Sequence, residues 1–444
     1  MKKRILLALL LVVALSITAC SGGSEEPVTE EPGTQEPAPV EGIKASITVQ
    51  VEPSWKPYYE AAAQRVIEKN PEAVIEFIEI PSFDHLDVLD ATDVTNPDVA
   101  DVFAIPADRI YGLSRNEALA ALDAKTMAAN IGGFDDFDAG LGGNFNIDGE
   151  YLAFPMNIET LVNFVNTKNA ENLGIDLTKD IEFTELGYQD MLIPAFDAWF
   201  GVSFTNAAGL ELLGKDDAGN LYSDMTKDFS ELNDQQKAVF TALYNYWKEH
   251  NQNGTPLWDA DAAWGYMDTE FATGGNTAIR LEGPWSTASL SALAGNGEDL
   301  DIIPINRVTV AGHPLAHWKG GWGMVINSRN EGDPDKMALG QAFIEEVLNP
   351  DYAVDFFKAT GKIMENVKVE EYMNSDLPEV DKKVISAVIE SYNNAPARPL
   401  FTEWGSVWDT WKNGILSWSS TKPATVEEAY SVMQAAFKSM MNNF

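Results

Sequence analysis

The chain has 444 residues, with 30 Lys or Arg against 68 Asp or Glu, so its formal net charge at pH 7 is -38. Such an acidic protein repels phosphate backbones, which argues against nucleic acid as a partner, whereas a neutral solute such as a sugar is not repelled. The single cysteine, Cys20, excludes a disulfide within the chain, so the fold depends on burial of apolar side chains.

The N-terminus has the pattern of a secretory signal peptide. Three basic residues at 2–4 precede an apolar run over 5–15, which is shorter than the ~20 residues that a membrane-spanning helix requires. The ending Ile17-Thr18-Ala19-Cys20 resembles the lipobox of bacterial lipoproteins. We therefore expect a signal peptide over 1–19 and a lipid anchor on Cys20. The alternatives are an ordinary signal peptide that happens to contain a cysteine, or a short membrane anchor.

Residues 20–43 have the composition of a tether. Glu and Pro alternate through this segment without apolar periodicity. Glutamates repel one another and prolines stiffen the chain, so we expect an extended, disordered segment that holds a folded body away from a membrane. A long tether suits the outer face of a cell membrane in a Gram-positive type of envelope.

The folded body begins with a strand, a helix and two further strands. The patterns predict a strand over 45–51, a turn over 52–57, a helix over 58–68, and strands over 73–80 and 97–104. This spacing is typical of a βαβ unit with a parallel sheet, in which ligands bind at the carboxyl ends of the strands. The turn after Val51 and the loop after Ala104 lie at those ends.

The remaining segments continue the α/β pattern over a length that suits two domains. Strands are predicted over 161–166 and 320–327, a helix end, turn, strand and loop over 271–285, and helices over 334–348 and 353–359. The last stretch is dense in tryptophan, with Trp404, Trp408, Trp411 and Trp418.

Three segments, taken in order, resemble a known family. They are Pro106-Ala107-Asp108-Arg109-Ile110-Tyr111-Gly112, then Phe154-Pro155 with Ile158-Glu159-Thr160-Leu161 and Asn166, then Thr277-Ala278-Ile279 with Gly283-Pro284-Trp285. From Ala45 to Phe444 the chain is similar to bacterial extracellular solute-binding lipoproteins of carbohydrate ABC transporters, in particular the maltose- and maltodextrin-binding proteins.

The resemblance implies an α/β fold of the periplasmic-binding-protein type, with two lobes, a hinge and an interlobe ligand cleft. Lobe one would comprise 44–157 plus 319–373, and lobe two 158–318 plus 374–444. The hinge crossings would fall near 156–157, 317–319 and 373–376. The implied protein is a monomeric binder without enzymatic activity or cofactor. It captures an oligosaccharide, with malto-oligosaccharides as the most specific expectation, and delivers it to a transporter permease by closing the lobes.

Sugars present C–H faces and hydroxyl groups, so a sugar binder needs flat aromatic faces together with carboxylate or guanidinium groups. The resemblance assigns ligand binding to Trp55, Asp108, Arg109, Glu159, Asp197, Trp199, Trp285 and Trp404. Each has a structural alternative: a solvated loop pair for the Asp-Arg dipeptide, a capping role for Glu159, and core packing for the tryptophans. Trp404, Trp408 and Trp411 share a helical face, of which we expect only Trp404 to reach the cleft.

The chain departs from the family at two points. Ile105 stands where the family member compared has a tryptophan, and an arginine near the family's terminal aromatic clamp is replaced around Asp409. Both changes bear on the sugar preferred.

Two other functions use similar residues. A glycan-capturing surface lipoprotein without its own transporter shares the sugar chemistry. A glycoside hydrolase needs two carboxyl groups ~5–9.5 Å apart, and no such pair stands out. A metal site is disfavoured because Pro314 separates the i, i+4 pair His313 and His317.

Overall fold

The computed structural model describes residues 42–216 and 218–444. The predicted signal peptide, the lipidation of Cys20 and nearly all of the predicted tether lie outside these ranges. In the described ranges, no helix combines the length and the apolar character needed to cross a membrane.

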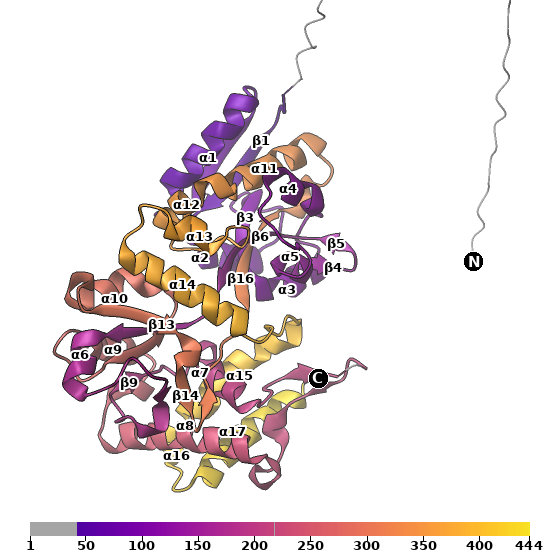
Figure 1. Cartoon of the computed structure of the whole chain (residues 1–444). Coiled ribbons are helices and arrows are strands. Elements are labelled where there is room, and N and C mark those ends of the chain that lie inside the picture. The colour runs from indigo at the N-terminus through magenta and orange to yellow at the C-terminus, as the bar shows by residue number, and fades with distance from the viewer. Residues whose placement is uncertain (1–41, 217) are drawn as a thin grey trace, which may run out of the picture. The chain divides into compact units, whose positions relative to one another are not determined.

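A five-stranded sheet forms the first half of the fold (Figure 1). Its strand order is β2 (Val74–Glu79), β1 (Ser46–Val51), β3 (Val102–Pro106), β16 (Gly320–Ile326) and β6 (Phe154–Glu159). β1 pairs in parallel with β2 and β3, whereas β16 runs antiparallel to β3 and β6. The predicted βαβ unit is thus confirmed, and the carboxyl ends of β1 and β3 lie at the same edge of the sheet.

The third strand begins later than predicted, at Val102 rather than residue 97. Asn96 closes a local turn, because its Oδ1 accepts a hydrogen bond from the Asp98 backbone N–H at 2.9 Å. Pro97 has no N–H to offer a strand neighbour. The turn therefore takes residues that the apolar pattern assigned to the strand.

Helices cover both sides of this sheet. They include α1 (Lys56–Lys69), α2 (Ser82–Ala91), α11 (Pro334–Val347) and α12 (Ala353–Thr360), and the last two match the predicted helices closely. α11 begins sharply because Asp333 accepts a hydrogen bond from the Lys336 N–H and Pro334 occupies the first helical position.

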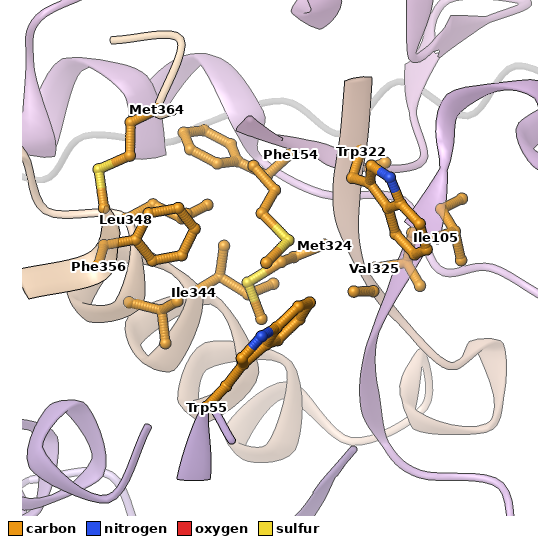
Figure 2. Packing of buried hydrophobic residues seen from close by; sticks show 14 of the residues in the cluster. Trp55, Ile105, Phe154, Trp322, Met324, Val325, Ile344, Leu348, Phe356 and Met364 are labelled. Carbon is orange, nitrogen blue, oxygen red and sulfur yellow. The ribbon is translucent and has the colours of Figure 1, made fainter. Parts of the chain in front are cut away.

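The buried side chains between these elements form what we call the first core (Figure 2). Phe154, Met324 and Ile344 are fully buried in it. Trp55 and Trp322 belong to the same cluster, but they lie at the end of the sheet where β1 and β3 finish. The first core thus anchors two indole rings beside the edge at which a ligand is expected.

A four-stranded sheet forms the second half of the fold. Its order is β13 (Leu300–Pro304), β7 (Val162–Asn166), β12 (Ile279–Glu282) and β9 (Met191–Leu192). A separate cluster of buried side chains, which we call the second core, lies against this sheet. Neighbouring residues on the strands face different clusters: Phe164 joins the first core beneath α14 (Glu379–Asn394), while Val165 joins the second core. This second core also contains residues of α7 (Ala198–Ala208), α8 (Asp234–Gln252), α15 (Gly405–Leu416) and α17 (Val426–Met441).

Shorter elements complete the described chain. The helices are α3 (Ile110–Arg115), α4 (Ala124–Ile131), α5 (Leu141–Asn144), α6 (Thr167–Leu173), α9 (Ala263–Phe271), α10 (Thr287–Leu293), α13 (Val369–Met373) and α16 (Trp418–Thr421). The small strands are β4 (Asn146–Ile147), β5 (Glu150–Tyr151), β8 (Ile181–Glu182), β10 (Gly214–Lys215), β11 (Leu221–Tyr222), β14 (Val308–Val310) and β15 (His313–Pro314).

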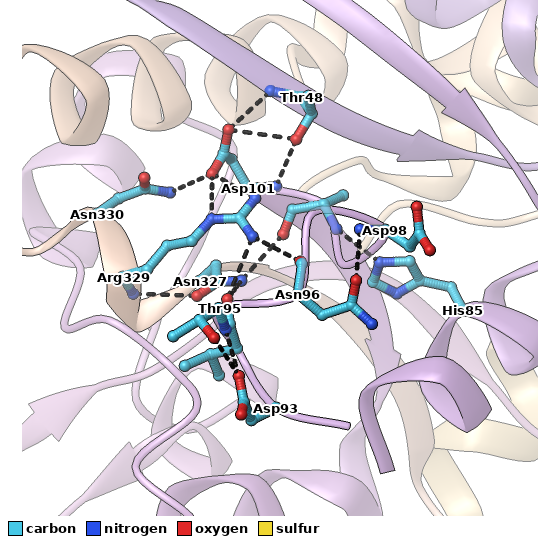
Figure 3. A network of polar contacts seen from close by, with 12 residues as sticks. Thr48, His85, Asp93, Thr95, Asn96, Asp98, Asp101, Asn327, Arg329 and Asn330 are labelled. Carbon is cyan, nitrogen blue, oxygen red and sulfur yellow. Dashed lines mark hydrogen bonds and ion pairs between the residues drawn. The ribbon is translucent and has the colours of Figure 1, made fainter. Parts of the chain in front are cut away.

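A polar network fixes the edge of the first sheet that is opposite the carboxyl ends of β1 and β3 (Figure 3). Asp101 accepts hydrogen bonds from the Thr48 backbone N–H at 2.9 Å, from Asn330 Nδ2 at 3.0 Å and from Arg329 Nε at 2.8 Å. Burial opposes the charged carboxylate, but these hydrogen bonds and the guanidinium hold the pKa of Asp101 below its ordinary value. The network connects β1, the start of β3 and the end of β16. It lies away from the edge where β1 and β3 end, at which a ligand is expected.

Candidate functional site

A cavity of about 760 Å³ lies at the carboxyl ends of β1 and β3. Both cores contribute side chains to its wall. The lining residues are Glu52, Ser54, Trp55, Phe83, Pro106, Asp108, Arg109, Asn157, Ile158, Glu159, Trp199, Pro284, Trp285, Trp322, Thr360, Gly361, Lys362, Arg398 and Trp408.

Six of the eight residues predicted to bind ligand line this cavity: Trp55, Asp108, Arg109, Glu159, Trp199 and Trp285. Local structure explains their positions. Trp55 precedes α1, and the short helix η1 (Ala107–Arg109) directly follows β3, so both lie at the strand ends. Glu159 ends β6, and after two intervening residues the chain enters β7 of the other sheet.

One wall of the cavity combines two indole rings with an ion pair whose two side chains are each only 14% exposed. Lys362 Nζ lies 5.5 Å from the ring centroid of Trp55 and 4.5 Å from that of Trp322. The same ammonium lies 3.7 Å from Glu159 Oε2, which also accepts a hydrogen bond from Trp322 Nε1 at 3.1 Å. Burial lowers the pKa of Lys362, while Glu159 and Glu52 act in the opposite direction. The lysine thereby fixes the rings and the carboxylate relative to one another.

The facing wall is formed by three more tryptophans. The Trp199 ring centroid lies 6.4 Å from that of Trp285 and 6.5 Å from that of Trp408. Trp285 follows the Gly283-Pro284 turn and is 48% exposed, which is high for so large an apolar side chain. An exposed ring on a cavity wall can contribute its face to a ligand.

Trp199 is held in place by His317. Burial lowers the pKa of His317 to about 3, and the Arg398 guanidinium acts in the same direction, so the imidazole is neutral. Since a carbonyl oxygen only accepts, His317 Nε2 donates its proton to the Trp199 carbonyl at 2.9 Å. The two rings also meet edge to face, with centroids 4.3 Å apart. This histidine serves packing and orientation.

Two predicted residues do not line the cavity. The carboxylate of Asp197 accepts a hydrogen bond from the Trp199 backbone N–H at 2.9 Å and so caps the N-terminus of α7. Trp404 is only 4% exposed, and its ring packs edge-on against Trp318 and Trp408 at 4.8 Å each. Trp408, one helical turn further along, lines the cavity in its place. The expected orientation of Trp404 was therefore wrong.

Several lining residues were not predicted from the sequence, notably Glu52, Phe83, Trp322, Lys362 and Arg398. Trp322 has a sequence signal, since it stands between glycines on a predicted strand. It pairs across the sheet with Pro106, next to the fully buried Ile105, and so supplies an aromatic ring beside the position where the family's tryptophan is absent. Arg398 enters from the segment before Trp404 and provides a guanidinium that was not predicted from the sequence.

The charges in the cavity balance. Glu52, Asp108 and Glu159 contribute three carboxylates, and Arg109, Lys362 and Arg398 contribute three cations. This neutrality contrasts with the net charge of -38 for the whole chain. In the described ranges, no group of three or more His, Asp or Glu side chains is arranged to hold a metal ion.

An α/β fold with two sheets and a cavity lined from both cores is the architecture of two-lobe solute-binding proteins. The chain belongs to the bacterial extracellular solute-binding protein family, whose model matches residues 44–372. None of the curated proteins compared with the chain matches it significantly.

Solved structures of similar fold cover most of the chain. The maltose-binding periplasmic protein MalE of Listeria monocytogenes, in complex with maltose, has a TM-score of 0.66 and 21% identity over 90% of this chain and 99% of that chain. MalX of Streptococcus pneumoniae, in complex with maltopentaose, has a TM-score of 0.65 and 20% identity over 88% and 99%. The GacH receptor of Streptomyces glaucescens has a TM-score of 0.66 and 16% identity over 90% and 99%. At these identities the likeness establishes the two-lobe fold.

Proposed function

We propose that this protein binds a neutral oligosaccharide in the cavity between its two cores, and that malto-oligosaccharides are its natural ligands. The observation that carries the proposal is the composition of the wall: five indole rings, from Trp55, Trp199, Trp285, Trp322 and Trp408, surround a set of charged groups that sum to zero. Indole faces suit the C–H surfaces of sugar rings, and the charged groups suit hydroxyls.

The solved neighbours support this class of ligand. MalE of Listeria monocytogenes was solved with maltose and MalX of Streptococcus pneumoniae with maltopentaose. An oligosaccharide has no net charge, so it gains from hydrogen bonds to Glu52, Asp108 or Arg109 without disturbing the charge balance of the cavity. A strongly charged ligand would upset this balance.

The proposed mechanism is a population shift between an open and a closed arrangement of the lobes. The chain crosses from β6 to β7 over only residues 160–161, which makes this connection a candidate hinge. A ligand that touches residues of both cores binds the closed arrangement better and increases its population. We propose that the closed protein then delivers its ligand to an ABC transporter permease, and that Cys20 anchors the protein at the outer face of the membrane.

Titration calorimetry of the purified protein against a panel of sugars tests this proposal. The panel comprises maltotriose, longer maltodextrins, and xylo-, cello- and fructo-oligosaccharides. We expect saturable binding of maltodextrins at micromolar concentration or below. If only a different sugar binds, the protein is still an oligosaccharide binder, but malto-oligosaccharides are not its ligands. Absence of heat with every sugar contradicts the proposal.

A further inference from the structure

Arg398 forms an ion pair across the cavity. Its Nη2 lies 2.9 Å from Oδ2 of Asp108, and the Arg398 side chain is only 6% exposed. Asp108 belongs to η1 at the end of β3, next to Ala107 and Ile110 of the first core. Arg398 lies in the connection between α14 and η11 (Thr402–Trp404), where it borders the second core. The pair therefore joins side chains that are anchored on opposite walls.

Three indole rings of the second core fix the direction of the guanidinium. Its Cζ lies 5.0 Å from the ring centroid of Trp199, 5.8 Å from that of Trp318 and 6.0 Å from that of Trp408. Cations are attracted to indole faces at such distances, most strongly where water is excluded. The backbone before Arg398 is also fixed, because Lys319 N–H donates to the Pro396 carbonyl at 2.9 Å. Arg398 is thus held ready on one wall, independently of Asp108.

We propose that the Asp108–Arg398 pair holds the two walls of the cavity together without ligand, and that Arg398 thereby sets how much of the free protein is closed. The proposal rests on the proposed function only in taking closure to be the way the protein holds its ligand. A contact that forms only in the closed arrangement raises the population of that arrangement. It therefore also raises the apparent affinity for any ligand that binds the closed arrangement. In the described part of the chain, Oδ1 of Asp108 is buried without a hydrogen-bond partner, so the pair with Arg398 satisfies only one of the two carboxylate oxygens.

Arg109 offers a matched control. It lines the same cavity and neighbours Asp108, but its guanidinium pairs with Asp90 at 2.6 Å. Asp90 lies on α2, which packs against β3 on the same side of the cavity. Removing the Arg109 charge therefore changes the charge of the cavity as much as removing that of Arg398, yet it breaks no contact between the walls.

The test measures the distance between the walls in the absence of sugar. Spin labels are placed on exposed positions, Thr126→Cys on α4 and Gln252→Cys on α8, in a full-length chain carrying Cys20→Ser, and pulsed electron resonance gives the distance distribution. We expect Arg398→Met and Asp108→Asn each to lengthen the mean distance, the double variant to match the single ones, and Arg109→Met to leave it unchanged.

An unchanged distribution in both Arg398→Met and Asp108→Asn, or an equal lengthening in Arg109→Met, would overturn the proposal. Circular dichroism checks that each variant is folded. If Arg398→Met does not fold, the distance measured in Asp108→Asn alone tests the proposal. In sugar titrations we expect Arg398→Met to bind about fivefold or more weakly. Because the distances are measured without sugar, their outcome does not depend on whether the protein binds oligosaccharides.

Discussion

The indole ring of Trp285 lies directly over Gly283. A Cβ atom added at Gly283 would come within 2.1 Å of the ring, far closer than any contact allows. The φ angle of Gly283 is -96°, which any residue can adopt, so only the space above its Cα requires glycine. The Gly-Pro-Trp turn therefore determines where the exposed ring stands on the cavity wall.

Replacement of Gly283 by alanine should displace Trp285 and weaken sugar binding about tenfold, equivalent to ~1.4 kcal/mol. The half-exposed ring can swing outward, so we expect a loss in the free energy of unfolding below about 1.5 kcal/mol. Calorimetric titration and thermal melting measure the two effects. Gly332→Ala is the control, because no atom lies within 4 Å of a Cβ added there. Equal sugar affinity in both variants would contradict this reading of the turn.

Removal of the ring itself should have a similar effect. In Trp285→Ala we expect at least a ~tenfold loss of sugar affinity with the fold intact, since a half-exposed side chain contributes little to the core. Tyr222→Ala removes an equally exposed aromatic ring at a position that does not line the cavity. Affinity that is unchanged in a folded Trp285→Ala protein would remove Trp285 from the site.

Two tryptophans one helical turn apart should separate binding from stability. Trp404 is buried, so Trp404→Ala is expected to lower the free energy of unfolding by about 3–5 kcal/mol. Trp408 lines the cavity and is partly exposed, so Trp408→Ala should mainly reduce sugar affinity. Urea unfolding and sugar titration of both variants give the comparison. A larger loss of stability in Trp408→Ala than in Trp404→Ala would reverse the assignment.

Glu365 should make stability depend on pH. Its Oε1 accepts a hydrogen bond from the Leu141 N–H at 2.7 Å, while Oε2 is buried without a partner in the described chain. Burial raises the pKa of Glu365 to about 7, and the Leu141 hydrogen bond opposes the shift only in part. The folded protein therefore binds a proton that the unfolded chain has released, and stability falls as pH rises from about 4.5 to 7.

We expect this one carboxyl group to change the free energy of unfolding by at most about 3 kcal/mol over that pH interval. Glu365→Gln cannot titrate, so it should be less sensitive to pH over that interval than the parent, and more stable than the parent at pH 8. Urea unfolding at pH 5, 6, 7 and 8 measures the difference. Glu370→Gln, on the exposed surface, controls for the loss of a charge. Parallel pH profiles for the parent and Glu365→Gln would show that this carboxyl does not titrate there.

The sequence was most informative where side-chain periodicity and short motifs coincide. The alternation over 45–51 predicted β1, and the motifs around Asp108, Glu159 and Trp285 led to residues that line the cavity. Arg398 and Lys362 were missed because each lies in an irregular segment that is positioned by pairing with a remote strand: Ala397 pairs with Lys319, and Ile363 with Ile158. Such pairings leave no periodic pattern near the residue concerned.

Trp404 illustrates a different limit. The spacing of Trp404, Trp408 and Trp411 predicted a shared helical face, but periodicity does not tell which end of that face reaches the cavity. Packing against Trp318 decides it, and Trp318 lies far away in the sequence.

The most direct test of the central claim is a crystal structure of the protein grown with maltotriose. We predict density for sugar rings inside the cavity, with at least one ring stacked on Trp285 or Trp199 and hydroxyls within hydrogen-bond distance of Asp108 or Glu159. A cavity that stays empty at saturating maltotriose, or sugar bound only elsewhere on the surface, would contradict the assignment of this cavity as a malto-oligosaccharide site.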